Sequence, residues 1–315
     1  MDISVVVPVY NEEESLPELA EWIARACTVA GLSYEILLID DGSTDSTWSV
    51  IRKLKASDKN ILGISFRRNY GKAAALHTGF GEAAGDVVIT MDADLQDSPD
   101  EIPELYHMIK EGGYDLVSGW KKKRHDPFIK KFTSKIYNFT ARRASGIKLH
   151  DFNCGLKAYR KDVTKSIEVF GEMHRYIPML ARESGFGRIG EKVVEHRARK
   201  YGVTKYGLDR FIKGYLDLFT ITFITRFGKR PMHLFGTGGT LLFLAGFIMA
   251  LYLGIKKLHY LNIGIRAPLV TDNPWFYIAL TVMILGTFFF LAGFLAELIN
   301  RTSTGRNEYL IKEKI

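Results

Sequence analysis

Short apolar runs and longer amphipathic stretches alternate over the first 119 residues of the chain. The apolar runs are nearly continuous in valine, isoleucine and leucine, which is typical of strands buried on both faces. Strands that alternate with helices predict an α/β fold with a mostly parallel sheet and helices on both faces. The expected strands are SVVVPVY, EILLIDD, ILGISF, DVVITMD and YDLVSG, and the expected helices cover 14–30, 45–56, 72–84 and 99–111.

Local signals refine this pattern. Ser43 or Thr44 is the expected N-cap of the second helix, because a hydroxyl there can accept a hydrogen bond from a free backbone N–H. Pro99 suits the first turn of the fourth helix. The segment GFGRIG at 185–190 fits the G-x-G-x-x-G pattern of dinucleotide sites, but the residues after it alternate like a strand. We therefore interpret this segment as a turn.

The last third of the chain has a different pattern. Residues 232–255 and 274–296 contain no Asp, Glu, Lys or Arg, and each run exceeds the ~20 residues that cross a hydrocarbon core. We expect a two-span transmembrane hairpin over 231–300 and a tail over 301–315; the alternative is a pair of buried core helices. By the positive-inside rule, both flanks lie in the cytoplasm. The flanking basic residues are Arg226, Lys229, Arg230, Arg301 and Arg306.

Residues 207–230 combine apolar positions at helical spacing with interspersed charges. Because this segment directly precedes the first apolar run, we expect one or two amphipathic helices in the membrane interface. The alternative is an ordinary amphipathic helix that packs on the preceding domain. The α/β domain is then expected over 1–206.

The composition adds a bias towards anionic partners. The chain has 315 residues and a formal net charge of +8, which suits a nucleic acid, an anionic membrane surface or a phosphorylated substrate. Cys27 and Cys154 are far apart, so we expect neither a disulfide framework nor a zinc site, and a reducing compartment. The first residues carry an acid at position 2 and soon a proline, so we expect no signal peptide and a cytoplasmic domain.

Polar clusters follow three of the predicted strands. The carboxyl ends of parallel strands meet at one edge of the sheet, where such folds bind ligands, so we expect the clusters to form a common site. The clusters are Tyr10-Asn11-Glu12, Asp40-Asp41-Gly42-Ser43 and Asp92-Ala93-Asp94.

The third cluster indicates a divalent cation. Asp92 and Asp94 share a face if the backbone is extended, and Gln96, the single glutamine of the chain, follows with Asp97. Neighbouring carboxylates repel each other unless a cation lies between them. Mg²⁺ or Mn²⁺ is commonly held by one or two carboxylates and the phosphates of a substrate. The alternative is a solvated turn before the fourth helix.

The pair Asp40 and Asp41 admits two interpretations. Acidic residues at a strand end bind ribose hydroxyls in nucleotide-binding folds. They also occur in acidic turns that precede a capped helix. The residues alone leave both interpretations open.

Further segments complete an ordered set that spans nearly the whole chain. In chain order the segments are PVYNEEESL, IDDGSTDST, NYGKAAALHTGF, MDADLQDSP, DFNCGLKAYR at 151–160 and RKYGVTKY at 199–206.

Together these segments resemble family 2 glycosyltransferases of the GT-A fold. With the C-terminal apolar runs, they are most similar to the polyprenyl-phosphate glycosyltransferases, which include dolichyl-phosphate mannose synthases and bacterial undecaprenyl-phosphate sugar transferases. The resemblance implies a Rossmann-like sheet and the inverting transfer of a sugar from a UDP- or GDP-sugar to a polyprenyl phosphate, with Mg²⁺ or Mn²⁺. The departures are Asn153-Cys154 for Thr-Ser, Lys157 for Arg and Trp120-Lys121 for Ser-Arg.

The resemblance also implies roles at the strand ends. Asp92, Asp94 and Gln96 would hold the metal and the diphosphate, and the two aspartates would be catalytic residues. Lys72 would lie near the donor; its alternative is a helix-start lysine in solvent. The nucleotide site would comprise Pro8, Tyr10, Glu12, Asp40, Asp41, Lys72, Asp92 and Ala93.

A second implied group serves the acceptor. Arg199 and Lys205 would be catalytic residues that close over phosphates, since a guanidinium and an ammonium suit phosphate oxygens; a loop bound only to headgroups is the alternative. Asp151 would orient the acceptor or cap a turn. The segment 120–131 has six Lys or Arg residues that meet either headgroups or the lipid phosphate. The acceptor-phosphate contacts would be Lys121, His174, Arg175, Arg199, Thr204 and Lys205.

The expected partners are a nucleotide sugar, a polyprenyl phosphate and a membrane, in a prokaryotic plasma membrane, with no nucleic acid; a homo-oligomer is compatible with the sequence. One rival is a processive polysaccharide synthase, whose Q-x-x-R-W motif cannot occur because Gln96 is the only glutamine. The second rival is a non-catalytic membrane scaffold with a degenerate transferase domain. The intact Asp92 and Asp94 argue against it. A third rival, a nucleotide-dependent oxidoreductase, lacks its fingerprint in this sequence.

Overall fold

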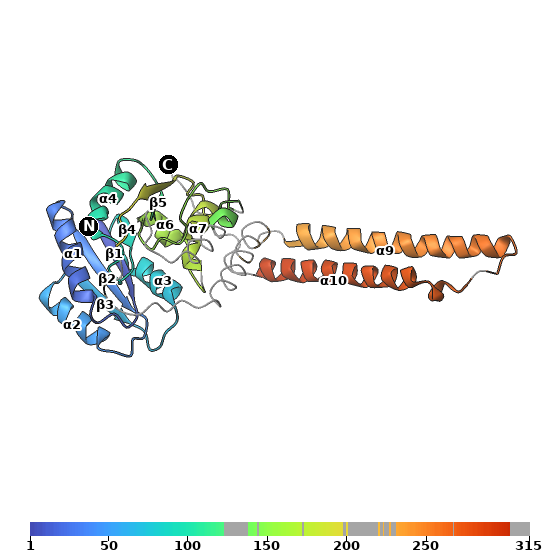
Figure 1. Ribbon diagram of the computed structural model, residues 1–315, viewed down its shortest axis with the longest axis horizontal. Coiled ribbons are helices and arrows are strands. Elements are labelled where there is room, and N and C mark those ends of the chain that lie inside the picture. The colour runs from blue at the N-terminus through green and yellow to red at the C-terminus, as the bar shows by residue number, and fades with distance from the viewer. Residues whose placement is uncertain are drawn as a thin grey trace. The chain divides into compact units, whose positions relative to one another are not determined.

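The computed structural model describes residues 1–122, 138–143, 145–171, 173–197, 200, 220, 223, 227, 231–266 and 268–302. The chain divides into two compact units, Met1–Thr222 and Phe223–Ile315 (Figure 1). The predicted interfacial segment lies almost entirely outside the described residues, as do Arg199, Thr204 and Lys205.

Unit 1 is built on a seven-stranded sheet with the order β3-β2-β1-β4-β6-β5-β7. Strands β3, β2, β1 and β4 run parallel, β6 is antiparallel to β4 and β5, and β7 is parallel to β5. The predicted mostly parallel α/β sheet is confirmed. The strands are β1 (Ile3–Val9), β2 (Tyr34–Asp40), β3 (Ile61–Ser65), β4 (Val87–Thr90), β5 (Leu116–Trp120), β6 (Lys157–Arg160) and β7 (Ile189–Val193).

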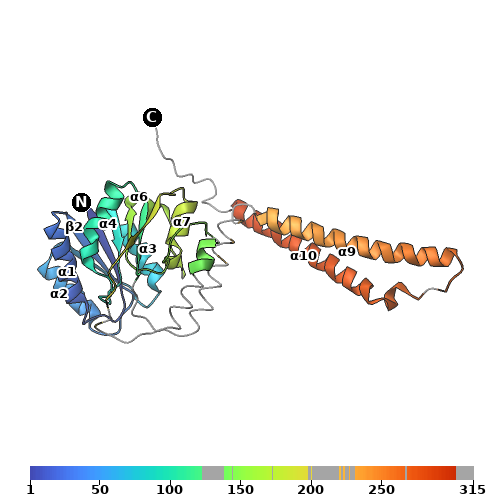
Figure 2. The same ribbon diagram turned by 45° about the horizontal axis from the view of Figure 1, so that its top comes forward.

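Helices cover both faces of this sheet (Figure 2). Along β1, Val5 and Val7 pack with α1, α2 and α4, whereas Val6 packs with α3, α6 and α7, because successive strand side chains point to opposite faces. Full burial of each such side chain contributes roughly 1.5–3 kcal/mol. The helices are α1 (Leu16–Val29), α2 (Thr47–Ser57), α3 (Lys72–Glu82), α4 (Ile102–Lys110), α6 (Lys161–Ser166) and α7 (Ile177–Glu183), with 3-10 turns η1 (Pro99–Glu101) and η2 (Met173–Arg175).

The start of α2 differs from the prediction. Its N-cap is Ser46, which makes no side-chain cap hydrogen bond, so the assignment to Ser43 or Thr44 was wrong. The Ser43 hydroxyl instead accepts a hydrogen bond from the backbone N–H of Asn11 at 2.9 Å. The Ser43 hydroxyl therefore links the loop after β2 to the loop after β1 and does not cap α2. The strand expected at the end of GFGRIG is confirmed by β7, which begins at Ile189; the turn lies at Gly185, before it.

Unit 2 contains α9 (Pro231–Asn262), a loop with the 3-10 turn η3 (Val270–Asp272), and α10 (Pro274–Thr302). Both helices are long and apolar enough to cross a membrane. They pack through glycines: a Cβ on Gly239 would lie 2.6 Å from the Gly286 oxygen. The missing side chains let the two backbones approach closely.

Candidate functional site

The carboxyl ends of β2, β1 and β4 are neighbours, so the three polar clusters of the sequence lie along one edge of the sheet. The loops after β1 and β2 are joined directly, because the Asn11 side-chain oxygen accepts a hydrogen bond from the Thr44 N–H at 2.8 Å. Asn11 has a positive φ of 55°, which turns the chain sharply after the strand. This cross-linking gives the edge a defined shape before any ligand binds.

Asp40 and Asp41 are both buried at the end of β2, but they have different surroundings. Asp40 accepts hydrogen bonds from the Ser43 N–H and the Ser65 hydroxyl, which satisfies its carboxylate within the protein. Asp41 accepts from two backbone N–H groups, those of Tyr70 and Gly71, at 2.7 and 2.9 Å. Burial raises the pKa of Asp41. Through its two hydrogen bonds, Asp41 also fixes the backbone of the segment that leads into α3.

Three further predicted nucleotide residues lie at the end of β1 and just after it. Pro8 is partly buried within β1, and Tyr10 is exposed directly after it. The backbone N–H of Glu12 donates to the Thr47 hydroxyl at 3.0 Å. Gly42 has a φ of 71°, and a Cβ on it would lie 2.4 Å from the backbone carbon of Arg68. Glycine is needed there for both the conformation and the close approach.

Asp92, after β4, forms an ion pair with Lys72 at the start of α3. Burial opposes ionisation of Asp92, but the charge and the hydrogen bond of Lys72, together with the charge of Lys121, outweigh it and lower the pKa of Asp92 to about 2. Gly155 packs against the same carboxylate: a Cβ there would lie 2.5 Å from Asp92 Oδ2. The Asp92 carboxylate is thus ionised and confined between α3 and the chain before β6.

Asp94 lies in a tight turn of the same segment. Its carboxylate accepts a hydrogen bond from the Gln96 N–H at 3.2 Å. Leu95 between them has a positive φ of 58°, which is uncommon for a residue with a side chain. Backbone strain of this kind is concentrated at functional sites. The turn brings Asp92, Asp94 and Asp97 close enough for their charges to interact.

Asp97 was not assigned a role from the sequence, yet it is a fully buried acid of this cluster. The Lys121 ammonium lies 2.7 Å from Asp97 Oδ1. Burial opposes the charge of Lys121, but Asp97 outweighs it and raises the pKa of the lysine. Lys121, predicted at the acceptor phosphate, is therefore placed beside the acidic cluster. Only the sheet shows this, since the two residues come from different loops.

The chemistry of this cluster fits a divalent cation. Asp97 Oδ2 is buried without a hydrogen-bond partner in the described part of the chain, and carboxylate oxygens are the ligands that Mg²⁺ and Mn²⁺ prefer. Among the described residues, no group of three or more His, Cys, Asp or Glu side chains could hold a metal by itself. A cation here would therefore take further ligands from a substrate, as Mg²⁺ commonly does with phosphates.

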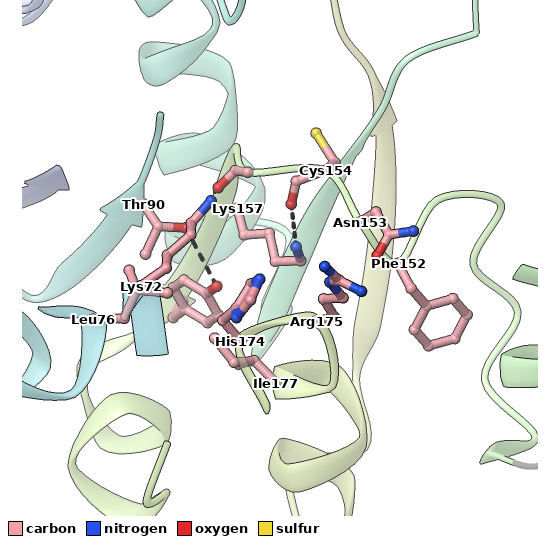
Figure 3. A pocket seen from close by; sticks show the side chains of 12 residues that line it. Lys72, Leu76, Thr90, Phe152, Asn153, Cys154, Lys157, His174, Arg175 and Ile177 are labelled. Atoms are coloured by element: carbon pink, nitrogen blue, oxygen red, sulfur yellow. Dashed lines mark hydrogen bonds between the residues drawn. The ribbon is translucent and has the colours of Figure 1, made fainter. Parts of the chain in front are cut away.

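A small cavity opens beside Asp92, lined by residues from α3, β4, β6 and η2 (Figure 3). His174 and Arg175 of η2, which the sequence predicted at the acceptor phosphate, line the same cavity as Lys72. Burial, Lys72 and Arg175 lower the pKa of His174 well below its usual value, so the imidazole is neutral at pH 7. The residues that line the cavity are Lys72, Leu76, Thr90, Phe152, Asn153, Cys154, Gly155, Lys157, Tyr159, His174, Arg175 and Ile177.

Asp151 is buried and organises a turn. Its Oδ1 accepts a hydrogen bond from the Asn153 N–H at 3.0 Å, and its own N–H donates to Glu191 at 3.0 Å. The structure thus displays the capping geometry that the sequence left as the alternative for this residue. Because the turn leads to Asn153 and Cys154, Asp151 shapes the cavity wall indirectly.

Arg199, Thr204 and Lys205 lie outside the described residues, but the residues beside them are anchored. The Arg197 guanidinium lies 4.4 Å from the centre of the Trp22 ring, and Lys200 pairs with Glu18 at 2.6 Å. The backbone N–H of Arg197 also donates to the backbone carbonyl oxygen of Gln96 at 3.0 Å. The chain on either side of Arg199 is thereby tied to α1 and to the acidic segment.

The chain is similar to known proteins over most of its length. Residues 4–168 match the family model described as glycosyl transferase family 2. Dodecaprenyl-phosphate galacturonate synthase from Rhizobium johnstonii is 38% identical, over 96% of this chain and 88% of that protein. Undecaprenyl-phosphate 4-deoxy-4-formamido-L-arabinose transferase from Proteus mirabilis is 35% identical, over 95% of this chain and 88% of that protein.

Solved structures show the same fold at low identity. Glucosyl-3-phosphoglycerate synthase from Mycobacterium tuberculosis, crystallised with Mn²⁺ and UDP-glucose, superposes with a TM-score of 0.54 at 20% identity. The match covers 71% of this chain and 78% of that one. The family match and the two relatives, which align with nearly the whole of this chain, show that this chain is a glycosyltransferase that belongs to glycosyltransferase family 2.

Proposed function

We propose that this enzyme transfers a sugar from a UDP- or GDP-sugar to the phosphate of a membrane polyprenyl phosphate, with inversion. One observation carries the proposal: an acidic cluster at the strand edge lies directly beside a cavity with several basic side chains. The first suits a metal and a diphosphate, and the second suits an anionic acceptor. The names of both relatives describe transfer to a polyprenyl phosphate.

Asp92 and Asp94, with Gln96, would hold Mg²⁺ or Mn²⁺ together with the donor diphosphate. When bound, the metal would supply Lewis-acid stabilisation of the departing nucleoside diphosphate. Asp41, Tyr10, Glu12 and Pro8 would border the nucleoside, on the loops after β1 and β2. Asp40 would hold the loop of this pocket in place and not contact the nucleoside, because its carboxylate already accepts hydrogen bonds from Ser43 and Ser65.

The acceptor needs no strong base. The second pKa of a phosphate monoester is near ~6, so the acceptor is largely dianionic at neutral pH and can attack directly. This agrees with a neutral His174, which can donate a hydrogen bond without adding charge. We assign His174, Arg175, Arg199, Thr204 and Lys205 to phosphate placement, and Lys121 to the charge balance of the acidic cluster.

The two apolar helices would anchor the enzyme in the plasma membrane, with the catalytic unit and both termini in the cytoplasm. The segment 207–230 would lie at the interface, where the phosphate of the lipid is located. This arrangement brings a water-soluble donor and a lipid acceptor to one site.

The test is transfer from a panel of UDP- and GDP-sugars to undecaprenyl phosphate by purified protein with Mn²⁺ or Mg²⁺. The panel includes galacturonate, 4-formamido-arabinose, glucose and mannose donors. We expect a lipid-soluble product from one donor, and a loss of about 100-fold, or roughly 2.7 kcal/mol, with EDTA or with Asp94→Asn. Asp162→Asn, which changes an exposed surface acid, should keep full activity. Unchanged transfer in EDTA and in Asp94→Asn would refute the metal assignment.

A further inference from the structure

The cavity beside Asp92 is lined by several nitrogen-bearing side chains. Its volume is about 20 Å³, which is room for about one water molecule or one oxygen of a ligand. Among the described residues that line it are Lys72, Lys157, His174 and Arg175, and none is acidic. Figure 3 shows that the nitrogen atoms of these four side chains gather around a common space. Asp92 forms an ion pair with Lys72, but Asp92 is not one of the residues that line the cavity.

Lys157 is the most deeply buried of the four, with 3% of its surface exposed. Its ammonium donates a hydrogen bond to the Cys154 oxygen, and it forms no ion pair with any described residue. Burial lowers the pKa of Lys157. A buried ammonium without an anionic partner is costly, so this site favours a ligand that supplies the missing charge.

His174 provides a second argument. Its Nδ1 is buried and has no hydrogen-bond partner in the part of the chain that the structure describes. Buried polar atoms are normally hydrogen bonded, so an orphaned nitrogen on a side chain that lines a cavity indicates a ligand or an ordered water. Lys157 and His174 come from β6 and η2, which share no sequence pattern. Only the fold brings an uncompensated cation and an open hydrogen-bonding group together.

We propose that this cavity binds an oxyanion of a substrate, with Lys157 as a charge-bearing contact at its inner wall. The inference rests on the proposed function and deepens it, because Lys157 belongs to no site assigned above. The cavity adjoins the Asp92 segment, so its ligand must lie close to the donor diphosphate. Two substrate groups have the required chemistry: the phosphate of the acceptor lipid and a carboxylate on the donor sugar. Either would insert one oxygen between Lys157, His174 and Arg175.

Thermal unfolding of the full chain in detergent and EDTA tests the proposal without transfer activity. The probes are inorganic phosphate, free galacturonic acid and neutral galactose, each at an ionic strength matched with potassium chloride. We expect phosphate, galacturonate or both to raise the unfolding temperature by about 3 °C or more, and galactose to have no effect. Phosphate alone would indicate the acceptor as the source of the oxyanion, and galacturonate alone would indicate the donor sugar.

Lys157→Met should abolish this stabilisation, whereas its unfolding temperature without anion should equal or exceed that of the wild type. Lys161→Met is the matched control, because Lys161 also donates to a backbone oxygen, that of Ala84, but does so on the surface. If Lys157→Met does not fold, Arg175→Met serves as the second variant and should also lose the anion effect. Stabilisation by neither anion, or an equal effect in wild type and variant, would overturn the proposal.

The two proposals fail separately. Wild-type protein that forms the lipid product, but shows no anion-dependent stabilisation, would contradict the oxyanion site and leave the transferase function standing. Protein that is stabilised by an anion through Lys157, yet yields no product from any donor, would contradict the proposed function and leave the anion site standing.

Discussion

At the scale of single residues, Gly155 is the position where the smallest change should have the largest effect. A Cβ at this position would lie 2.5 Å from Asp92 Oδ2 and 2.7 Å from its Cγ. The carboxylate would have to move, and it is the group that we assign to the metal. Overpacking of this kind typically costs about 1–3 kcal/mol.

We therefore expect Gly155→Ala to lower metal-dependent transfer about tenfold or more, since ~1.4 kcal/mol corresponds to a factor of ten. Metal affinity, measured by calorimetry with Mn²⁺ and the nucleoside diphosphate, should fall by a similar factor. Gly81→Ala in α3 is the control, because a Cβ on Gly81 meets nothing within 4 Å. A Gly155→Ala enzyme with wild-type Mn²⁺ affinity would show that Asp92 does not hold the metal.

At the scale of elements, the segment after β7 is fastened to α1. Arg197 stacks on Trp22, and the Trp22 indole N–H donates to Asp100 at 2.8 Å. Lys200 adds an ion pair to Glu18. These contacts hold the chain on both sides of Arg199, which we assign to the acceptor phosphate. A cation–π contact at an exposed site contributes roughly 0.5–1 kcal/mol.

Trp22→Leu removes the stacking and the indole donor, so we expect the KM for the lipid acceptor to rise about two- to fivefold. The affinity for the nucleoside diphosphate should stay unchanged, because the nucleotide loops are fastened elsewhere. Trp48→Leu is the matched control, since Trp48 carries its own arginine contact, with Arg52 at 5.6 Å, on α2. If both variants change the acceptor KM equally, the effect is one of general stability and not of loop position.

At the scale of the whole molecule, the membrane arrangement is open to direct measurement. The two long apolar helices are compatible with one hairpin, and Thr271 lies exposed in the loop between them. The native thiols of Cys27 and Cys154 are buried, and burial raises the pKa of each to about 12. Both should therefore be unreactive towards maleimides, because the thiolate is the reactive species.

A cell-impermeant maleimide should label Thr271→Cys in intact cells. It should label Lys53→Cys, on the exposed face of α2, only after the cells are permeabilised. The unmodified chain should give no signal in either case. Labelling of Lys53→Cys in intact cells would place the catalytic unit outside the cytoplasm and contradict the predicted orientation.

The sequence by itself determined the α/β class, the parallel strands, the gathering of three polar clusters at their carboxyl ends and the two apolar helices. These properties depend on local periodicity and on short motifs, and both can be recognised from neighbouring residues in the sequence. It also predicted that Asp92 and Asp94 hold a metal, because two acids directly after a buried strand suggest a cation site even before their neighbours in space are known; this stays a prediction. It misplaced the N-cap of α2, because Ser43 is used by a neighbouring loop that local reasoning does not include.

Only the tertiary structure decided which charges meet. The pairs Lys72–Asp92 and Lys121–Asp97 join different elements, and the packing of Gly155 on Asp92 depends on β6 lying beside β4. The cavity around Lys157 has the same origin, since its lining comes from α3, β4, β6 and η2. Electrostatic partners are set by distance in space, and burial determines how strongly each charge is felt. Neither quantity can be obtained from residue order alone.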